Sequence, residues 1–248
     1  MNDVVLELKN IHKAFGSNRV HRGINISLSK GESLGLLGGS GTGKSALLRS
    51  IIGLERIDEG EILFKGERID HLHENKLTPF RIKISYSFQS GALFDSINVF
   101  ENIAYPLFEH TKLTYSQIKE KVAEMLKLID LEGREEIMPS DLSGGMQKRV
   151  GMARAMILNP EIVLYDEPTA GLDPSNTLNV VSLMQKLKKK GLASIFVTHD
   201  IPSALMLCDR IVVLHEGKII FNDTPIKFQK TDDPIVKKFV IEQGTSHD

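Results

Sequence analysis

The sequence predicts an α/β fold with a mainly parallel core sheet, an N-terminal antiparallel β subdomain and a helical insert. Three features lead to this prediction. Short apolar runs bounded by glycine or charged residues recur early and late in the chain, as buried parallel strands do. Loose alternation near the N-terminus favours antiparallel strands, and the pattern from about 91 to 159 is helical. We therefore expect a single domain over 1–248, with a core in 1–90 and 160–248 around a helical subdomain.

The composition is that of a globular protein that folds without disulfides. The 248 residues are 41% hydrophobic, which is enough for a substantial core. Cys208 is the only cysteine, and the N-terminus has no charged region followed by an apolar run, so we expect a reducing, cytoplasmic setting. No apolar run approaches the roughly 18 residues that cross a bilayer, so a membrane role would need a partner. The formal net charge of −1 argues against nucleic acid as a partner.

The first part of the chain predicts an antiparallel flap. Residues 4–8 alternate loosely as an edge strand, a turn follows Phe15, and residues 24–28 form a second strand. Residues 61–64 add another strand and a turn. Phe15 either stacks on an adenine ring or is a core aromatic, and one aromatic residue does not separate these readings.

A glycine-rich loop lies between an apolar strand at 33–37 and a helix at 46–52, and it fits G-x-x-x-x-G-K-S, the phosphate-binding P-loop. The glycines let several backbone N–H groups converge on one anion at a helix N-terminus. Lys44 would reach the outer phosphates of a nucleoside triphosphate, and the Ser45 hydroxyl would hold Mg²⁺. The alternative is a turn that binds nothing. The predicted nucleotide contacts are Gly38, Gly39, Ser40, Gly41, Thr42, Gly43, Lys44, Ser45 and Ala46.

A strand at 84–89 ends on Gln89, whose amide is either solvated or a ligand of Mg²⁺ and the attacking water.

In the helical region that follows, Thr114 and Gln117 form a capping box. Pro106 should end or kink a helix, so we expect two short elements at the start of this region. One apolar helix face comprises Ile118, Val122, Met125, Leu126 and Ile129.

The end of the helical region carries a second glycine pair. A helix is expected from Met146 to about Leu158, with Ser143 before it. Ser143 is either a simple N-cap or part of a second phosphate contact. Gly144 and Gly145 favour the contact, because poor helix formers there would bare backbone N–H groups at a positive helix end.

Two carboxylates follow the apolar strand that begins at residue 162. In an open α/β sheet the ligand site lies at the carboxyl ends of the parallel strands. Asp166 suits water-mediated Mg²⁺ binding, and Glu167 suits orienting or deprotonating the attacking water. A solvated acidic turn is the alternative. After the next buried strand at 194–198, His199 is either a surface residue or a contact to the terminal phosphate.

The C-terminal third predicts a capped helix, a hairpin and a final helix. Asp173 caps a helix over 175–190, a hairpin spans 210–221, and a last helix spans about 233–242. The helix face expected to be buried comprises Leu178, Val181, Met184 and Leu187. The lysines at 186–190 indicate a solvated helix end rather than a nucleic-acid patch. We expect no appended regulatory domain.

The order of these motifs resembles that of ATP-binding cassette ATPases, over nearly the whole chain. The resemblance implies a P-loop NTPase fold with a RecA-like core, in which two cassettes sandwich two ATP molecules. Ser143, Gly144 and Gly145 would then act on the nucleotide held by the other subunit. Gln89 would sense the nucleotide, Asp173 would couple the two sites, and His199 would contact the γ-phosphate. Phe15 stands where these cassettes commonly have a tyrosine, and it keeps the stacking face.

A narrower resemblance lies after Gln89. The segments 88–94, 98–107 and 109–111 look like the cassette of the Mla-type phospholipid transporters. This implies an ATP-hydrolysing, homodimeric subunit on the cytoplasmic face of the inner membrane, beneath a permease, powering phospholipid transport linked to outer-membrane lipid asymmetry. A small accessory subunit and a lipid-binding subunit are further implied partners. The tail at 243–248 is shorter than in some forms of that cassette, which leaves open any dimer contact made by a tail.

Five large apolar residues lie between the sheet and the helical insert: Leu93, Phe94, Ile97, Val99 and Phe100. They are either core of the insert or the lining of a groove for a short permease helix, with the permease contacted near Leu93 and Phe94. Three other functions stay open: a cassette of another importer or exporter, a cassette ATPase acting on nucleic acid or ribosomes, and a nucleotide sensor that does not hydrolyse. The intact Glu167 and His199 argue against the sensor.

Overall fold

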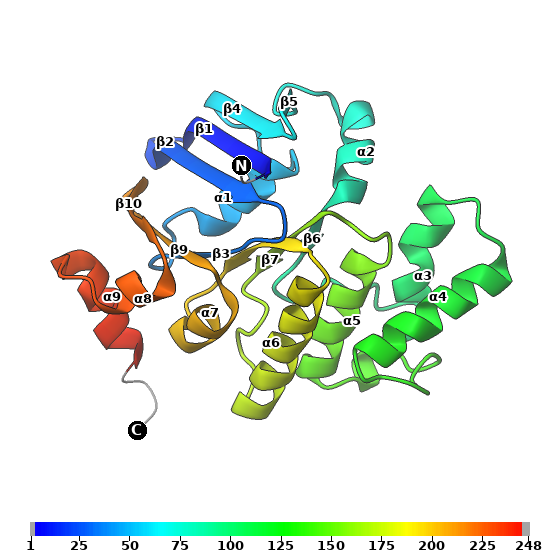
Figure 1. Ribbon diagram of the computed structural model, residues 1–248. Helices are drawn as coiled ribbons and strands as arrows, with labels where there is room; N and C mark the ends of the chain where they lie inside the picture. The colour runs from blue at the N-terminus through cyan, green and yellow to red at the C-terminus, as the bar shows by residue number, and fades with distance from the viewer. Residues whose placement is uncertain (1–2, 245–248) are drawn as a thin grey trace.

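The computed structural model describes the chain over residues 3–244 and the side chains over 3–240. Two sheets lie one above the other, and a helical arm extends to one side (Figure 1). The upper sheet is antiparallel, with the strand order β2-β1-β4-β5. Its strands are β1 (Val4–Phe15), β2 (Asn18–Ser29), β4 (Glu59–Phe64) and β5 (Glu67–Arg68). The predicted fold class is confirmed.

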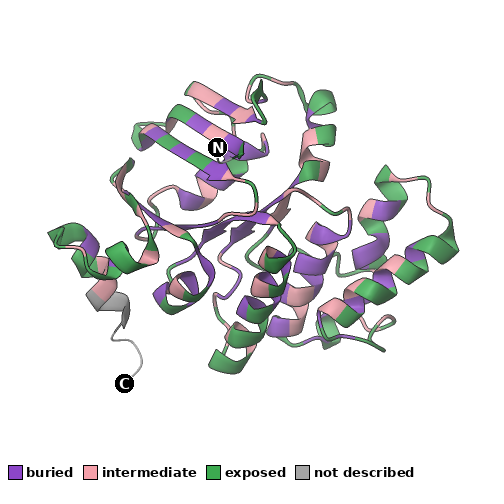
Figure 2. Ribbon diagram, in the orientation of Figure 1, coloured by how far each residue is buried: buried purple, intermediate pink, exposed green. Residues whose placement is uncertain are grey.

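The second sheet is the core sheet, with the order β10-β9-β3-β8-β7-β6. All of its neighbouring pairs are parallel except β9 with β10, which form the predicted hairpin. Its strands are β3 (Ser33–Leu37), β6 (Ile84–Ser87), β7 (Ile162–Asp166), β8 (Ala193–Val197), β9 (Arg210–His215) and β10 (Lys218–Asp223). Every residue of β3, β7 and β8 is buried, as in a sheet covered on both faces (Figure 2). The carboxyl ends of these parallel strands therefore meet along one edge.

Strand β1 is not an edge strand, so that expectation was wrong. It lies between β2 and β4, with Leu6 paired to Leu28 on one side and to Phe64 on the other. The alternation in residues 4–8 reports that one face is buried. It carries no information about how many neighbours the strand has, because backbone pairing lies in the plane of the sheet.

Two apolar cores hold the sheets and helices together. Helix α1 (Lys44–Ile51) lies between the two sheets, where Leu47, Leu48 and Ile51 join the core formed by the inner faces of both. The second core lies under the other face of the core sheet and continues into the helical arm. Both faces of the strand that ends in Asp166 are thus covered, and its carboxyl end is fixed in place.

The helical arm matches the expectation of helices without strands over residues 91–159. It contains α3 (Val99–His110), α4 (Tyr115–Leu128), the 3-10 turn η1 (Pro139–Asp141) and α5 (Gly144–Met156). The capping box of α4 is present, and Ile118, Val122, Leu126 and Ile129 are buried, with Met125 packed against them. The helix does not end at Pro106, because α3 continues through it, so the two short elements expected there are one helix. Proline removes one backbone N–H, and α3 is held on its other sides by packing against α4 and α5.

Helix α2 (Glu74–Lys83) was not predicted. It contains Pro79, and Leu77 is its one buried residue, so the segment has no apolar stripe to reveal a helix. The arginine Arg81 holds its last turn to the core by donating from Nε to the Ile52 carbonyl oxygen at 2.9 Å. This helix forms by docking on the core rather than by amphipathic periodicity.

The C-terminal third forms helices α6 (Pro174–Lys189), α7 (Ile201–Leu207), α8 (Pro225–Gln229) and α9 (Pro234–Gly244). Leu178 was expected to be buried in α6 but is 57% exposed. The buried face turns toward Val180, Val181, Leu183, Met184 and Leu187. Residues 245–248 of the predicted tail lie outside the described residues.

Cys208 is buried just after α7, and burial raises the pKa of its thiol, which agrees with the expected packed thiol. Lys188 of the lysine cluster donates to the Leu207 carbonyl oxygen and contacts Asp209, as expected of a helix end.

Within the part of the chain that the structure describes, no helix combines the length and apolar character that a bilayer crossing needs.

Helix α6 offers a matched test of the buried face. Leu183→Ala should lower the free energy of unfolding by about 2–5 kcal/mol, because it leaves a cavity between helix and sheet. Leu178→Ala makes the same change at an exposed position and should stay within about 0.5 kcal/mol of the parent. Urea unfolding followed by circular dichroism measures both. Equal losses would contradict the helix orientation described here.

Candidate functional site

The P-loop turns tightly between β3 and α1. A Cβ on Gly38 would fall on the Leu214 carbonyl oxygen, so only glycine fits there. Gly43 has φ +94°, and a Cβ on it would lie 2.8 Å from Nε2 of His21. That ring nitrogen lies 3.0 Å from the Gly43 carbonyl oxygen, which is consistent with a tautomer that donates from Nε2. Burial lowers the pKa of His21, so the neutral ring is favoured against the loop.

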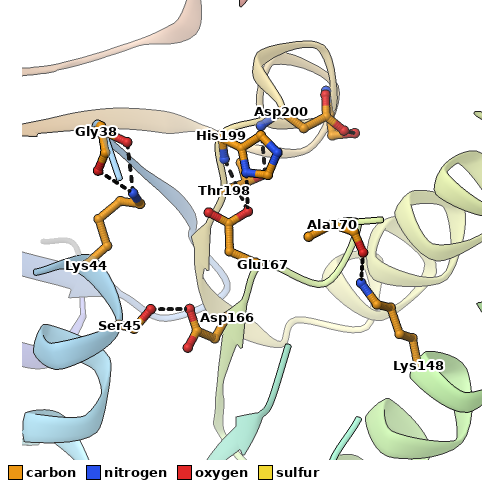
Figure 3. A network of polar contacts seen from close by, with 12 residues as sticks. Gly38, Lys44, Ser45, Lys148, Asp166, Glu167, Ala170, Thr198, His199 and Asp200 are labelled. Carbon is orange, nitrogen blue, oxygen red and sulfur yellow. Dashed lines mark hydrogen bonds and ion pairs between the residues drawn. The ribbon is translucent and has the colours of Figure 1, made fainter. Parts of the chain in front are cut away.

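Lys44 lies within the curve of the P-loop. Its Nζ donates to the carbonyl oxygens of Gly38 at 2.8 Å and Gly39 at 3.0 Å (Figure 3). Burial lowers the pKa of Lys44, and the nearby carboxylates of Glu167 and Asp166 offset part of this effect. A buried cation beside carbonyl oxygens and backbone N–H groups is suited to a polyanion.

Asp166 is the centre of a short chain of hydroxyl contacts at the end of β7. Ser45 Oγ donates to its Oδ1 at 2.7 Å, and the Tyr86 hydroxyl donates to its Oδ2 at 2.6 Å. Gln89 and Asp166 line one cavity of about 370 Å³. The hydroxyl, carboxylate and amide oxygens are the donors that Mg²⁺ prefers, with phosphate oxygens to complete the shell. No group of three or more His, Cys, Asp and Glu side chains suited to a metal occurs among the described residues.

Glu167 and His199 face each other across the same edge of the sheet. Glu167 has φ +48°, a conformation that a non-glycine residue adopts only where its surroundings hold it. Its N–H donates to the Val197 carbonyl oxygen at 2.9 Å, which fixes the turn after β7. Its Oε2 then lies 2.8 Å from Nδ1 of His199 and accepts from the His199 backbone N–H at 3.3 Å (Figure 3). The carboxylate is therefore held at His199, and only 14% of the Glu167 side chain is exposed.

Lys148 was missed by the sequence analysis. It reaches from α5 to donate to the Ala170 carbonyl oxygen, in the loop that follows Glu167 (Figure 3). Burial lowers its pKa, and the charge of Glu167 opposes that change. Its position five residues after Ser143 gave no sign of this contact, because the partner atom is a backbone carbonyl in a distant loop. Tyr86 was missed for a similar reason, since its hydroxyl meets a carboxylate on another strand.

The glycine pair after Ser143 forms a second cluster. Ser143 caps α5 by accepting from the Met146 N–H at 3.4 Å. Asp173 caps the neighbouring α6 and accepts from Asn176 Nδ2 at 2.5 Å. A Cβ on Gly145 would also lie 2.5 Å from Asn176 Oδ1, so the two helix starts are in contact. Over residues 3–240, no hydrogen bond joins this cluster to the P-loop.

Phe15 is 46% exposed at the tip of the β1–β2 hairpin, with the Lys13 ammonium 4.9 Å from its ring centroid. The core reading is therefore wrong. Its contact with an adenine ring stays a prediction, as do the nucleotide and catalytic roles assigned to the other site residues.

Comparison with known proteins agrees with this geometry. A family model described as ABC transporter matches residues 21–170. The chain belongs to the ABC transporter ATP-binding family. It is an ATPase that binds ATP and converts it with water to ADP and phosphate. The predicted family resemblance is thus confirmed.

Two relatives and one solved structure illustrate the family. The cassette is 36% identical to the intermembrane phospholipid transport system ATP-binding protein MlaF of Escherichia coli, over 95% of this chain and 88% of that protein. It is 39% identical to the probable ribonucleotide transport ATP-binding protein mkl of Mycobacterium leprae, over 96% of this chain and 69% of that protein. A dimeric post-hydrolysis structure of the cassette MJ0796 with ADP and Pi superposes with a TM-score of 0.82 at 31% identity, over 89% of this chain and 98% of that one.

Replacing Lys44 tests the P-loop of this cassette. Lys44→Ala should weaken ATP binding by about tenfold to a hundredfold and leave no measurable hydrolysis, because a buried charge-assisted contact to phosphate is lost. Calorimetric titration with ATP and a phosphate-release assay measure the two effects. Lys190→Ala, at the exposed C-cap of α6, removes a lysine far from the loop and should change neither. An unaltered affinity of Lys44→Ala for ATP would contradict the assignment of this loop to phosphate binding.

Proposed function

We propose that this cassette is the ATPase subunit of a membrane transporter that moves phospholipid, working as a homodimer on the cytoplasmic face of the inner membrane. The observation that carries the transporter role is an aromatic groove beside Gln89, described below. The similarity to MlaF supports phospholipid as the cargo. A permease, a small accessory subunit and a lipid-binding subunit are the partners that this proposal implies.

Hydrolysis follows from the arrangement at the strand ends. Lys44 and the P-loop N–H groups would bind the β- and γ-phosphates, and Ser45, Asp166 and Gln89 would hold Mg²⁺. The ion neutralises charge on the phosphates when it is bound. Glu167 orients the attacking water and accepts its proton. His199 holds Glu167 through its backbone N–H and Nδ1, and its ring contacts the γ-phosphate. Positioning and charge stabilisation supply most of the rate enhancement in such a site.

Each ATP would be shared by two copies of the chain. Ser143, Gly144 and Gly145 lie with Asp173 at adjoining helix starts, apart from the P-loop contacts of the same chain. The backbone N–H groups at the start of α5 suit a phosphate that belongs to a second cassette. The solved structure of MJ0796 is dimeric, which supports this arrangement. We assign stacking on the base to Phe15, and its exposure at the hairpin tip supports this role.

The groove lies where α2, the strand β6 and the helical arm meet. Its volume is about 540 Å³, and its lining includes the exposed rings of Phe88, Phe94 and Tyr105. Exposed aromatics gathered in one hollow are typical of a binding site. Val99 and Phe100, by contrast, are buried in the arm, and Leu93 packs against that core. Four members of the five-residue apolar cluster therefore divide into the core residues Leu93, Val99 and Phe100 and the groove residue Phe94, and the fifth, Ile97, is half-buried.

We assign the groove to a short amphipathic helix of the permease. Arg154 lies over the Phe94 ring at 5.2 Å and donates to the carbonyl oxygens of Gly91 and Ala92, so the aromatic wall is held in place. A preformed apolar wall is what a helix-in-groove contact needs. Phe88 lines both the groove and the cavity that Gln89 and Asp166 line, so an occupant of the groove would lie close to the nucleotide site.

Cargo other than phospholipid is the main alternative. The M. leprae relative is named as a probable ribonucleotide transport protein, so a different importer or exporter is a specific rival. Copurification of the membrane partner from native membranes, followed by extraction and mass spectrometry of bound lipid, separates the two. Enrichment of phospholipid over its level in the bulk membrane supports the proposal. A bound nucleoside without lipid overturns the assignment of phospholipid as the cargo. Stimulation of hydrolysis by DNA or RNA would favour a third class of function.

Changing Glu167 tests its catalytic role. Glu167→Gln keeps the shape and hydrogen bonding but removes the negative charge that activates water. Hydrolysis should fall by about a hundredfold to ten-thousandfold while ATP still binds. Phosphate release measures turnover, and sedimentation with ATP and Mg²⁺ should show a long-lived dimer. Near-normal turnover in Glu167→Gln would show that another group activates the attacking water.

The groove has a matched pair of aromatic residues for its test. Phe94 lines the groove and is 45% exposed, whereas Phe108 is 47% exposed on α3 but does not line it. Phe94→Asp should leave the isolated cassette folded and binding ATP while it loses the membrane partner, because a charge replaces an apolar contact. Phe108→Asp should retain the partner. Affinity copurification and lipid-transfer assays provide the readouts. Retention of the partner by both variants would place the docking site elsewhere.

A further inference from the structure

Tyr86 joins the site to the groove, and none of the roles above uses it. It lies on β6, where its register partner on β7 is Leu164. Side chains two residues apart on a strand share a face, so Asp166 and Tyr86 lie on the same side of the sheet. The Tyr86 hydroxyl reaches Oδ2 of Asp166 at 2.6 Å. Sheet register therefore sets this contact.

Each oxygen of the Asp166 carboxylate has a donor on a different element. Ser45 of α1 donates to Oδ1 at 2.7 Å, and Tyr86 of β6 donates to Oδ2. Two donors from opposite sides restrict rotation of the carboxylate about its χ2 bond. Arg49 lines the same cavity as Asp166 and Tyr86. If the Tyr86 hydroxyl were removed, Oδ2 would be free to turn toward this cation.

The ring of Tyr86 faces a second cavity. It packs on Phe88 with ring centroids 4.5 Å apart and planes tilted by 48°. Tyr86 and Phe88 line both the groove of about 540 Å³ and the cavity of about 370 Å³ that holds Gln89 and Asp166. These two rings thus form a wall shared by the groove and the metal-binding end of β7.

We propose that Tyr86 is a positioning residue: its hydroxyl fixes the Asp166 carboxylate for Mg²⁺, and its ring links that carboxylate to the groove wall. This inference rests on the proposed role of Asp166 at the metal ion. It adds a route between groove and site that does not pass through Gln89. Tyr86 contacts neither ATP nor the reacting water in this scheme and acts through Asp166.

Tyr86→Phe tests the hydroxyl with the ring retained. The Mg²⁺ concentration that half-saturates metal-dependent ATP binding should rise roughly tenfold, as for other partners that orient a metal ligand. ATP binding in EDTA should be unchanged. Titration with a fluorescent ATP analogue at varied Mg²⁺ measures both. An unchanged Mg²⁺ requirement, or an equal loss of binding in EDTA, would overturn the proposal, because either result leaves no specific effect on the metal.

Tyr165→Phe is the matched control. Tyr165 precedes Asp166 on β7, and its buried hydroxyl has no hydrogen-bond partner among the described residues. Its loss should leave the Mg²⁺ requirement unchanged. A thermal melt of both variants reports whether either change disturbs the fold. If Tyr165→Phe shifted the Mg²⁺ requirement as much as Tyr86→Phe, the proposal would be overturned, because a general disturbance of β7 would explain both shifts.

A double-mutant cycle with Asp166→Asn separates this inference from the proposed function. If Asp166→Asn alone leaves the Mg²⁺ requirement unaltered, the metal role of Asp166 fails, and the inference fails with it. If Asp166→Asn raises the requirement, Tyr86→Phe should add little in that background, because the two residues act through one contact. Fully additive effects would overturn the action of Tyr86 through Asp166 and leave the role of Asp166 intact.

The link to the groove has its own readout. The chain contains no tryptophan, so Phe88→Trp places a single indole reporter in the shared wall. ATP with Mg²⁺ should change its emission, and adding Tyr86→Phe should remove most of that change, because the ring is then no longer tied to Asp166. An equal emission change with and without the Tyr86 hydroxyl would overturn the link.

Discussion

The parallel pairing of β3, β8, β7 and β6 is the constraint on which the site depends. It brings the P-loop, the two carboxylates, His199 and the segment before Gln89 to one edge of a sheet that is buried on both faces. A buried carboxylate needs hydrogen-bond donors, and the neighbouring elements supply them to Asp166 from Ser45 and Tyr86. The core sheet therefore holds these side chains in position before any ligand binds, which is the condition for electrostatic preorganisation.

Local motifs account for the part of the site that could be predicted. The P-loop, the carboxylates after β7 and the caps at Ser143 and Asp173 each depend on residues close in sequence, and the structure places them as expected at strand and helix ends. What could not be predicted is non-local. The central position of β1 depends on a second neighbour that side-chain alternation does not report. The contacts of Tyr86 and Lys148 depend on sheet register and on a distant carbonyl, which no spacing encodes.

The wrong expectations share a physical cause, since each treated a local preference as decisive. Pro106 disfavours a helix interior, yet packing of α3 on its neighbours outweighs one missing hydrogen bond. Leu178 fits an apolar period but lies on the open side of α6, where no neighbour covers it. Helix α2 forms with no apolar stripe because Arg81 ties its end to the core. Tertiary contacts outweigh local propensity in α2 and α3, whereas Leu178 is exposed because no such contact covers it.

The segment after Gln89 is held at both ends by different parts of the molecule. On one side, β6 belongs to the core sheet, and Tyr86 is bonded to Asp166. On the other, Arg154 of α5 donates to the Gly91 carbonyl oxygen at 3.0 Å, and a Cβ on Gly151 would lie only 2.7 Å from the Gly91 backbone. Besides sharing an apolar core, the arm and the segment after Gln89 are therefore in close contact at Gly91. A tilt of the arm relative to the core must change the position of Gln89 or break one of these contacts, so the groove wall and the nucleotide site cannot move independently.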